Sequence, residues 1–308
     1  MNILLTSTSF QDTYGLHHDA LKATGFKIDY IRGPVNEDVL MPIIANYDGV
    51  ICGDDNFTKE VLEKGRSGKL KIISKYGIGL DKIDINTAKR LNIKVFNCPG
   101  VNHFAVAEHV FSLLLAFYKN IVHEINITKK GKWDRLIGHE IHGKRIGVVG
   151  MGRIGKQLLI ISKSFGLKLF AFDKNIDVKV AKSLNVEICQ DLPSIFSKVD
   201  IISLNMNLTN ENKYCINETL IKEHTKKGLL LINTARGELI QEEAIIMGLK
   251  KNILSGYLTD VMISEPMKKD HPFIKNSKIL ITPHIGSRTY QTVQRQGLKS
   301  IENLVNNI

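Results

Sequence analysis

The amino-acid sequence predicts an α/β protein of two domains, each built on a parallel sheet. Short β-branched runs alternate with helical segments along the chain, which is the pattern of repeated βα units. This series breaks at Asn97-Cys98-Pro99-Gly100 and starts again at Arg145. With 308 residues, the chain is long enough to form two hydrophobic cores.

The first series covers residues 2–99. Short apolar runs predict strands at 3–5, 27–31, 49–52, 72–74 and 93–96. Helical spacing predicts helices near 16–23, 36–45, 57–66 and 84–91. Beyond the break, a stretch that is apolar almost all round predicts one long buried helix from about Phe104 to His123. The polar segment 128–144 follows and carries the single tryptophan, Trp133.

The second series opens on a glycine-rich turn. A strand at Arg145–Val149 stops at Gly150-Met151-Gly152-Arg153-Ile154-Gly155, and the apolar spacing then becomes helical until Gly166. The next strand, 168–172, ends on Asp173. A strand, a G-x-G-x-x-G, a helix and an acid at this distance indicate a dinucleotide site, although three glycines can also form a purely structural turn. Further strands are predicted at 200–204, 229–232, 254–258 and 278–281, before a closing helix at about 290–305.

Each part of this turn has a physical role in binding a dinucleotide. Gly150 permits the tight strand-to-helix turn, Gly152 removes the side chain where a pyrophosphate approaches, and Gly155 lets the helix pack closely on the strand. The free N–H groups at the start of the helix stabilise the phosphates. Asp173 can accept hydrogen bonds from the ribose hydroxyls and would repel a 2′-phosphate, which favours NAD over NADP.

Composition indicates a globular protein of the cytoplasm. The chain is 43% hydrophobic and 24% charged, and its start has neither a basic leader nor a long apolar run. No run reaches the ~18 apolar residues of a membrane-spanning helix, so no membrane partner is expected. The four cysteines are scattered without a C-x-x-C, which predicts reduced thiols and no metal site: Cys52, Cys98, Cys189 and Cys215.

The net charge of +11 raises the question of nucleic acid. Lysine and arginine are spread along the whole chain, and neither a helix-turn-helix pattern nor a clustered basic face is found. We therefore expect no nucleic-acid partner. We interpret the net charge either as the result of a lysine-rich composition or as a positive electrostatic field that attracts an anionic cofactor and substrate.

Six motifs, in order, resemble those of the D-isomer-specific 2-hydroxyacid dehydrogenases, a family that includes D-3-phosphoglycerate dehydrogenase and the glyoxylate/hydroxypyruvate reductases. They cover most of the chain from 72 to 286: Lys75–Asp84 (KYGIGLDKID), Asn97–Gly100 with Val106–Glu108, the glycine-rich turn, Ile232–Gly237, Thr259–Val261 with Glu265-Pro266, and Thr282–Gly286.

The resemblance assigns three catalytic residues, and their chemistry suits the reaction. His284 would deliver the proton to the developing alkoxide, because the pKa of histidine lies near working pH. Glu265 would orient the imidazole and raise its pKa. Arg236 would offer its planar fork to the carboxylate and carbonyl oxygens of a 2-keto acid.

The resemblance also implies the residues that bind NAD and substrate. Asp260 is expected near the nicotinamide carboxamide, and the main-chain N–H groups around Ile78 and Gly79 are expected to hold the substrate's carboxylate. The expected cofactor-binding residues are Gly150, Gly152, Arg153, Ile154, Gly155, Asp173, Asn205, Thr209, Thr234, Ala235, Asp260, His284 and Gly286. The expected substrate-binding residues are Lys75, Tyr76, Gly77, Ile78, Gly79, Asn102 and Arg236.

The family's architecture implies a Rossmann-type NAD-binding domain, residues 100–286, inserted into a flavodoxin-like substrate-binding domain, residues 1–99 with 287–308. It also implies a homodimer, with segment 120–144 as the arm that joins the subunits. Because the chain runs only to Ile308, a short form without a C-terminal regulatory domain is expected.

Three features of the sequence, involving four positions, depart from the family pattern. Leu204–Thr209 reads Leu-Asn-Met-Asn-Leu-Thr, so Asn205 and Asn207 replace the usual His and Pro. Lys75 stands where many phosphoglycerate dehydrogenases have Arg, and Thr259 where the family prefers Leu. None of these changes touches the three expected catalytic residues.

The sequence therefore predicts an NAD-dependent enzyme that interconverts a D-2-hydroxy acid and its 2-keto acid. D-3-phosphoglycerate, a substrate of serine biosynthesis, is the first expectation, and glyoxylate, hydroxypyruvate or another 2-keto acid is the alternative. A non-enzymatic NAD-sensing binding protein is the alternative from another class.

Overall fold

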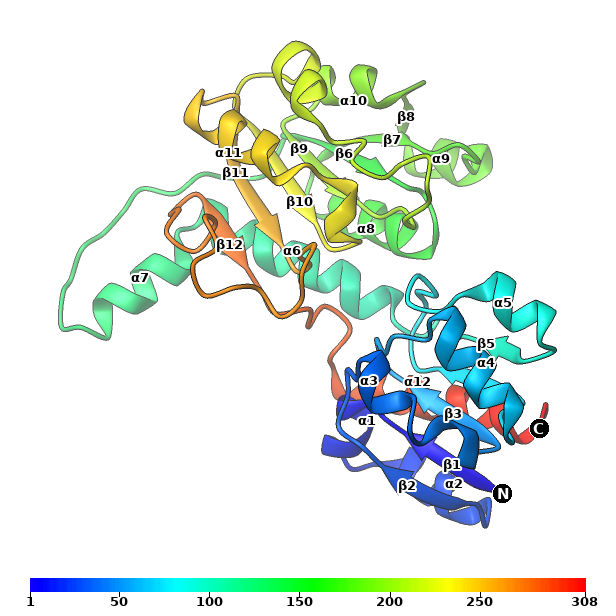
Figure 1. The fold of residues 1–308 in the computed structure, drawn as a ribbon. Coiled ribbons are helices and arrows are strands. Elements are labelled where there is room, and N and C mark those ends of the chain that lie inside the picture. The colour runs from blue at the N-terminus through cyan, green and yellow to red at the C-terminus, as the bar shows by residue number, and fades with distance from the viewer. The chain divides into compact units, whose positions relative to one another are not determined.

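The computed structural model describes all 308 residues and divides them into two compact units. Unit 1 comprises Met1–Asn102 and Arg288–Ile308, and unit 2 comprises His103–Ser287. Both chain termini therefore belong to unit 1 (Figure 1). Each unit contains one sheet in which every pairing is parallel, so the α/β fold class is confirmed.

Unit 1 holds a five-stranded sheet in the order β2-β1-β3-β4-β5, which is the flavodoxin-like order expected. Its strands are β1 (Asn2–Leu5), β2 (Lys27–Tyr30), β3 (Gly49–Cys52), β4 (Ile72–Lys75) and β5 (Lys94–Phe96). Its helices are α1 (Thr8–Asp12), α2 (Leu16–Ala23), α3 (Glu37–Leu40), the 3-10 turn η1 (Ile44–Asn46), α4 (Lys59–Ser67), α5 (Ile85–Arg90) and α12 (Tyr290–Val305).

The sheet of unit 1 is buried on both faces. The central strands β3 and β4 are wholly buried, as expected of parallel strands that are covered by helices on two sides. α12 packs with α1 and α2, while α4 packs with α5 and η1. Side chains cap three of these helices at their N-termini: Thr58 on α4, Asp84 on α5 and Thr289 on α12.

Unit 2 holds a seven-stranded sheet in the order β12-β11-β10-β9-β6-β7-β8. Its strands are β6 (Arg145–Val149), β7 (Lys168–Phe172), β8 (Glu187–Ile188), β9 (Ile201–Leu204), β10 (Leu229–Asn233), β11 (Leu254–Thr259) and β12 (Ile279–Ile281). Its helices are α6 (His103–Tyr118), α7 (Ile121–Thr128), α8 (Arg153–Ser164), α9 (Val178–Leu184), α10 (Leu192–Lys198), the π-helical turn η2 (Leu220–His224), the 3-10 turn η3 (Gly237–Leu239) and α11 (Glu242–Lys250).

Two hydrophobic clusters cover the faces of this sheet. α6 and α8 pack on one face around Ile146 and Val148, and α10, η2 and α11 pack on the other around Ile202 and Leu231. Figure 1 shows the two helical layers on opposite sides of the strands. The order of β6 to β11 is the doubly wound arrangement of dinucleotide-binding domains, as predicted.

The single long helix expected at 104–123 is wrong. α6 ends at Tyr118, Asn120 adopts a left-handed conformation with φ 54°, and α7 starts at Ile121. Asparagine tolerates that conformation, and the Asn120 side chain donates to the carbonyl of Ile137. α7 and the loop that follows it project from unit 2, and none of the residues of α7 is buried (Figure 1).

Two further differences concern polar or short segments. The helix expected at 36–45 is shorter, with α3 and η1 in its place. The two-residue strand β8 was not expected, because its exposed residues carry no apolar run. No single helix is long and apolar enough to cross a membrane; α6 and α7 reach that length only together, and they are bent by 63° at the break.

Candidate active site

The predicted cofactor and catalytic residues of unit 2 lie at the carboxyl ends of its parallel strands. The turn at Gly150 follows β6, Asp173 follows β7, and Asn205 follows β9. Arg236, Asp260 and His284 follow β10, β11 and β12 in the same way. The sheet changes direction between β6 and β9, and ligands of such sheets bind outside the strand ends at this switch point.

The glycine-rich turn leaves room where a cofactor needs it. Gly150 has φ 97°, and a Cβ atom there would lie 2.7 Å from the main chain of Asn205. A Cβ on Gly155 would lie 2.0 Å from the carbonyl oxygen of Gly150, so neither position accepts a side chain. Gly152, in contrast, faces open space. It precedes the twelve-residue helix α8 without a side-chain cap, which leaves the helix N–H groups for phosphate oxygens.

Asp173 is held by main-chain donors. Its Oδ2 atom accepts from the N–H of Met151 at 2.6 Å, and its Oδ1 atom accepts from the N–H of Asn175 at 2.7 Å. Each carboxylate oxygen keeps a second lone pair for a ribose hydroxyl. The residues around the glycine-rich turn therefore fit the adenosine half of NAD.

The loop after β9 carries two of the departures from the family pattern, Asn205 and Asn207. Asn205 donates to the carbonyl and hydroxyl oxygens of Ser203, while its own Oδ1 is buried without a partner. Asn212 ties the rest of the loop together, because it donates to the carbonyl of Asn207 and accepts from the N–H of Thr209. These hydrogen bonds fix the loop in the absence of the usual proline.

Asn233 is a positioning residue that the sequence did not single out. Its side chain is fully buried; it accepts from the N–H of Ala235 at 3.0 Å and donates to the carbonyl of Arg236 at 2.9 Å. The amide thus holds the turn that carries Thr234, Ala235 and Arg236. Its place in the motif Ile232–Gly237, between a buried strand and an arginine, was the signal available from the sequence.

Glu265 and His284 form a pair. Nδ1 of His284 lies 2.7 Å from Oε2 of Glu265, whose other oxygen accepts from the N–H of Met262 at 2.9 Å. Because the carboxylate is an acceptor, Nδ1 carries the hydrogen, and Nε2 is the nitrogen that exchanges a proton with a ligand. The side chains are 36% and 38% exposed, so the pair is open to a substrate.

Asp260 organises the turn that presents His284. Its Oδ1 accepts from Oγ1 of Thr282 at 2.6 Å and from the N–H of Ile285 at 2.9 Å, and its Oδ2 accepts from the N–H of Gly286 at 2.7 Å. Its carbonyl accepts from the N–H of His284, which has φ 53°. The resemblance places Asp260 near the nicotinamide. In this structure both oxygens of its carboxylate accept hydrogen bonds from residues of the turn.

His109, at the start of α6, completes this network. Its Nε2 lies 2.9 Å from Oγ1 of Thr282 and 3.3 Å from Oδ1 of Asp260. Burial raises the pKa of Asp260, but hydrogen bonds, led by that from His109, outweigh burial and keep the pKa below its ordinary value. His109 and Thr282 were not predicted as site residues, because nothing local in the sequence shows that α6 meets this turn.

In unit 1 the predicted substrate residues lie where β4 ends. The side chain of Lys75 is 4% exposed and donates to the carboxylate of Asp54 at 2.6 Å. The ring of Tyr76 is buried, and its hydroxyl donates to the carbonyl of Val293, so this side chain belongs to the core. The N–H groups of Ile78 and Gly79 donate no hydrogen bond within unit 1. Asn102 has a buried Oδ1 without a partner.

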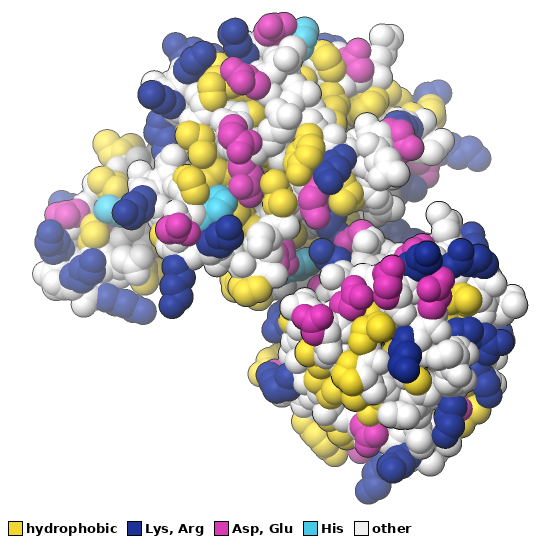
Figure 2. Space-filling model, in the orientation of Figure 1, with side chains coloured by type: hydrophobic (Ala, Val, Ile, Leu, Met, Phe, Trp, Pro, Cys, Tyr) yellow, Lys and Arg dark blue, Asp and Glu magenta, His cyan; other side chains and the backbone are white.

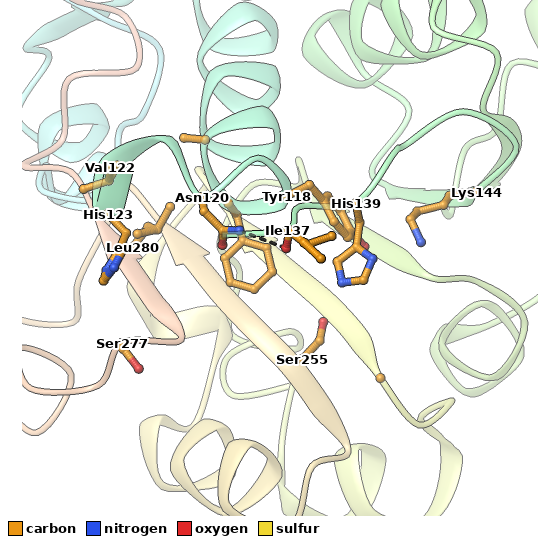
Figure 3. Close-up of a pocket in the computed structure, with 13 residues that line it drawn as sticks. Tyr118, Asn120, Val122, His123, Ile137, His139, Lys144, Ser255, Ser277 and Leu280 are labelled. Carbon is orange, nitrogen blue, oxygen red and sulfur yellow. Dashed lines mark hydrogen bonds between the residues drawn. The ribbon is translucent and has the colours of Figure 1, made fainter. Parts of the chain in front are cut away.

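A hollow of about 430 Å³ lies elsewhere in unit 2, away from the strand ends just described. Figure 3 shows Tyr118, His123, Ile137, His139 and Ser255 around it. No group of three or more His, Cys, Asp or Glu side chains is arranged to hold a metal ion. Figure 2 shows Lys and Arg side chains scattered over the drawn faces of both units.

Known proteins resemble the chain along most of its length. The family model of the D-isomer specific 2-hydroxyacid dehydrogenase NAD binding domain matches residues 111–286. D-3-phosphoglycerate dehydrogenase of Methanocaldococcus jannaschii is 34% identical over 92% of this chain, which spans 54% of that protein. Glyoxylate reductase of Thermofilum pendens is 36% identical over 88% of this chain and 81% of its own length. The apo-structure of D-lactate dehydrogenase from Escherichia coli matches with a TM-score of 0.85 at 28% identity, over 99% of this chain and 96% of that one.

Proposed function

Because the chain belongs to the family of D-isomer-specific 2-hydroxyacid dehydrogenases, which are NAD-dependent oxidoreductases acting on CH–OH groups, we propose that it interconverts a D-2-hydroxy acid and its 2-keto acid. One observation of the structure carries this proposal. His284 and Glu265 form a hydrogen-bonded pair on the same sheet edge as the glycine-rich turn that fits the cofactor.

The reduction transfers a hydride and a proton: 2-keto acid, NADH and H⁺ give the D-2-hydroxy acid and NAD⁺. NADH held at the glycine-rich turn would supply the hydride. Nε2 of His284 gives its proton to the carbonyl oxygen as that oxygen gains charge, and it recovers the proton from solvent. Glu265 keeps the ring oriented and stabilises the imidazolium, because its carboxylate accepts from Nδ1. In the oxidation, neutral His284 removes the hydroxyl proton.

Arg236 is proposed to hold the substrate. Its guanidinium can donate two parallel hydrogen bonds to a carboxylate, which orients the carbonyl carbon as well as binding the acid. Asn233 fixes the main chain on both sides of this residue. The N–H groups of Ile78 and Gly79, which have no partner in unit 1, are proposed as further donors to the carboxylate.

Two substrates are supported by relatives of similar identity. D-3-phosphoglycerate is the candidate from the relative in M. jannaschii, at 34%, and glyoxylate is the candidate from the relative in T. pendens, at 36%. The first would place the enzyme in serine biosynthesis. These relatives alone do not separate the two.

The test is oxidation of NADH, followed by its absorbance, with hydroxypyruvate, phosphohydroxypyruvate, glyoxylate, pyruvate and 2-ketoglutarate. We expect turnover of at least one acid and formation of the D-hydroxy acid, identified by chiral chromatography. NADH binding without turnover of any of the five would contradict the proposal and favour an NAD-sensing binding protein.

We further propose a cytoplasmic homodimer joined through the arm, residues 120–144. Large apolar side chains of the arm are exposed, which supports burial against another surface: Ile121, Val122, Ile125, Trp133, Leu136 and Ile137. Val122 and Ile137 of the arm also line the hollow in unit 2, so the apolar surface of the arm continues into it (Figure 3). Light scattering of the native protein and of Trp133→Ser tests this, since the variant should dissociate at higher concentration.

A further inference from the structure

We infer that the carboxyl edge of the sheet in unit 1 selects a small 2-keto acid without a phosphate group, through the ion pair between Asp54 and Lys75. This inference rests on the proposed function and chooses between the two substrates that the relatives leave open. It concerns the part of the substrate beyond the keto acid itself.

The location follows from the strand order of unit 1. The chain leaves β1 toward β2 on one side and returns to β3 on the other, so the sheet changes direction between β1 and β3. Ligands of doubly wound sheets bind outside the strand ends at this point. The segment Gly53-Asp54-Asp55 follows β3 directly, and Lys75 is the last residue of the neighbouring strand β4.

Asp55 fixes the segment that carries Asp54. The side chain of Asp55 is buried and accepts from the hydroxyl of Thr6, from the N–H of Val35 at 2.7 Å and from the N–H of Gly53 at 3.0 Å. These contacts join the ends of β1 and β3 with the loop after β2. Asp54 is therefore presented by a fixed main chain.

Lys75 is the cation at the end of the neighbouring strand, and its charge is already balanced. Its Nζ donates to the carboxylate of Asp54 and to the carbonyl of Gly53, and its side chain is only 4% exposed. A phosphate would have to displace Asp54 in order to reach it. Asp54 is 54% exposed, so a ligand at this edge meets the carboxylate before the ammonium group.

The next cation along the same edge is balanced too. Arg32, two residues after β2, holds both oxygens of Asp12 with its guanidinium, at 2.6 and 2.9 Å. Arg288 at the start of the last segment donates to the hydroxyl of Thr8. Lys75 and Arg32 thus face carboxylates of their own unit, whereas the partner of Arg288 is a neutral hydroxyl.

The charges decide which acid is preferred. A phosphate group is close to a dianion at neutral pH, and at a few ångströms from a carboxylate its repulsion is worth roughly tenfold in binding even in water. The carboxylate group is common to all 2-keto acids, so its binding does not distinguish between them. A 2-keto acid whose other substituent is a hydrogen atom or a hydroxymethyl group meets no such repulsion. The hydroxyl of a hydroxymethyl group can donate a hydrogen bond to Asp54.

The experiment compares hydroxypyruvate with phosphohydroxypyruvate, which differ only in the phosphate, in steady-state assays with NADH. We expect kcat/KM to favour hydroxypyruvate by about tenfold or more. Asp54→Asn removes the carboxylate and leaves Lys75 free to bind an anion, so it should reduce this preference about tenfold and strengthen inhibition by inorganic phosphate. Asp54→Ser should act in the same direction, which guards against an effect peculiar to one side chain.

Glu63→Gln is the matched control. Glu63 pairs with Arg90 on the surface formed by α4 and α5, so this variant makes the same charge change away from the strand ends. It should leave the preference unchanged. A native preference for phosphohydroxypyruvate, or an unchanged preference in both Asp54 variants, would overturn the inference while the proposed function stands. Absence of turnover with every keto acid would overturn both.

Discussion

The hydroxyl of Thr282 lies 2.6 Å from Oδ1 of Asp260, at the start of the turn that presents His284. This contact shows how the fold positions an imidazole that stands on a loop. Asp260 directly follows the buried strand β11, and its carboxylate accepts hydrogen bonds from Thr282, Ile285 and Gly286. The turn is thereby tied to the sheet, although His284 itself has the positive φ of 53° that few side chains adopt.

Asp260→Asn should impair catalysis by loosening this turn. An amide offers one acceptor oxygen where the carboxylate offers two, so at least one of the N–H groups of Ile285 and Gly286 loses its partner. The loss of charge-assisted hydrogen bonds corresponds to about 1.5–3 kcal/mol, and we expect kcat to fall roughly 10–100-fold. Stopped-flow and steady-state assays measure this. Asp260→Asn with native kcat would show that the turn does not depend on the carboxylate.

His284→Ala should lower kcat by about 10²–10⁴-fold, because general acid catalysis contributes this much. Binding of NADH, measured by fluorescence titration, should stay within a few-fold of native, since the adenosine half is held at the glycine-rich turn. Glu265→Gln should have a smaller effect, because it keeps a hydrogen-bond partner for Nδ1 while removing the charge that stabilises the imidazolium. Near-normal turnover in the His284 variant would remove this residue from the mechanism.

Arg236→Lys should act mainly on KM for the keto acid. Lysine keeps the charge but loses the planar fork that holds two oxygens, so we expect KM to rise by roughly 10–100-fold. Asn233 continues to hold the main chain in this variant, which confines the change to the side chain. Equal KM values for the native enzyme and the lysine variant would mean that the guanidinium does not bind the substrate.

Asp173→Asn should narrow the preference for NADH over NADPH. The amide no longer repels a 2′-phosphate, while its oxygen can still accept from the N–H of Met151. We expect the ratio of kcat/KM values for the two coenzymes to fall by about tenfold. Asp177→Asn is the control: Asp177 caps α9 and pairs with Lys156, and this nearby change in charge should leave the ratio unaltered.

The residues at the carboxyl ends of the strands could be predicted from the sequence, because a strand, a glycine-rich turn and a helix are local patterns. The doubly wound order of unit 2 and the places of Gly150, Asp173 and His284 at strand ends follow from such patterns and from the resemblance. The pairing of His284 with Glu265 also agrees with the family's motifs. Their catalytic roles stay predictions until the variants above are assayed.

Contacts between distant segments could not be predicted. His109 meets Thr282 across 173 positions, and no periodicity in α6 signals this. The break at Asn120 was missed because apolar residues continue through it, while a single left-handed residue redirects the chain. From the sequence, Lys75 was expected to bind the substrate with its positive charge. Only the structure shows that Asp54, 21 positions earlier, forms an ion pair with it.

Stability should fall in acid through Asp200, which lies at the opposite ends of the strands from the site. Its carboxylate accepts from Arg145 and from Lys226, joining the start of β6 to the segment before β10. Burial raises the pKa of Asp200, but the hydrogen bonds from Lys226 and Arg145 outweigh it and hold the pKa well below the ordinary value. Because the folded-state pKa is lowered, this contribution is fully present above the unfolded pKa near 4 and is lost as pH falls through the folded pKa.

Asp200→Asn should therefore lower the melting temperature at pH 7 by about 2–8 °C, which corresponds to about 1–2 kcal/mol. The difference between native and variant should shrink as the pH is lowered below 4, since protonation removes the same charge from the native protein. Calorimetry from pH 3 to pH 7 measures both. Because Asp200 is remote from His284 and Arg236, kcat at room temperature should be unchanged. A difference in melting temperature that stays constant with pH would show that the charge of the carboxylate is not what stabilises the strands.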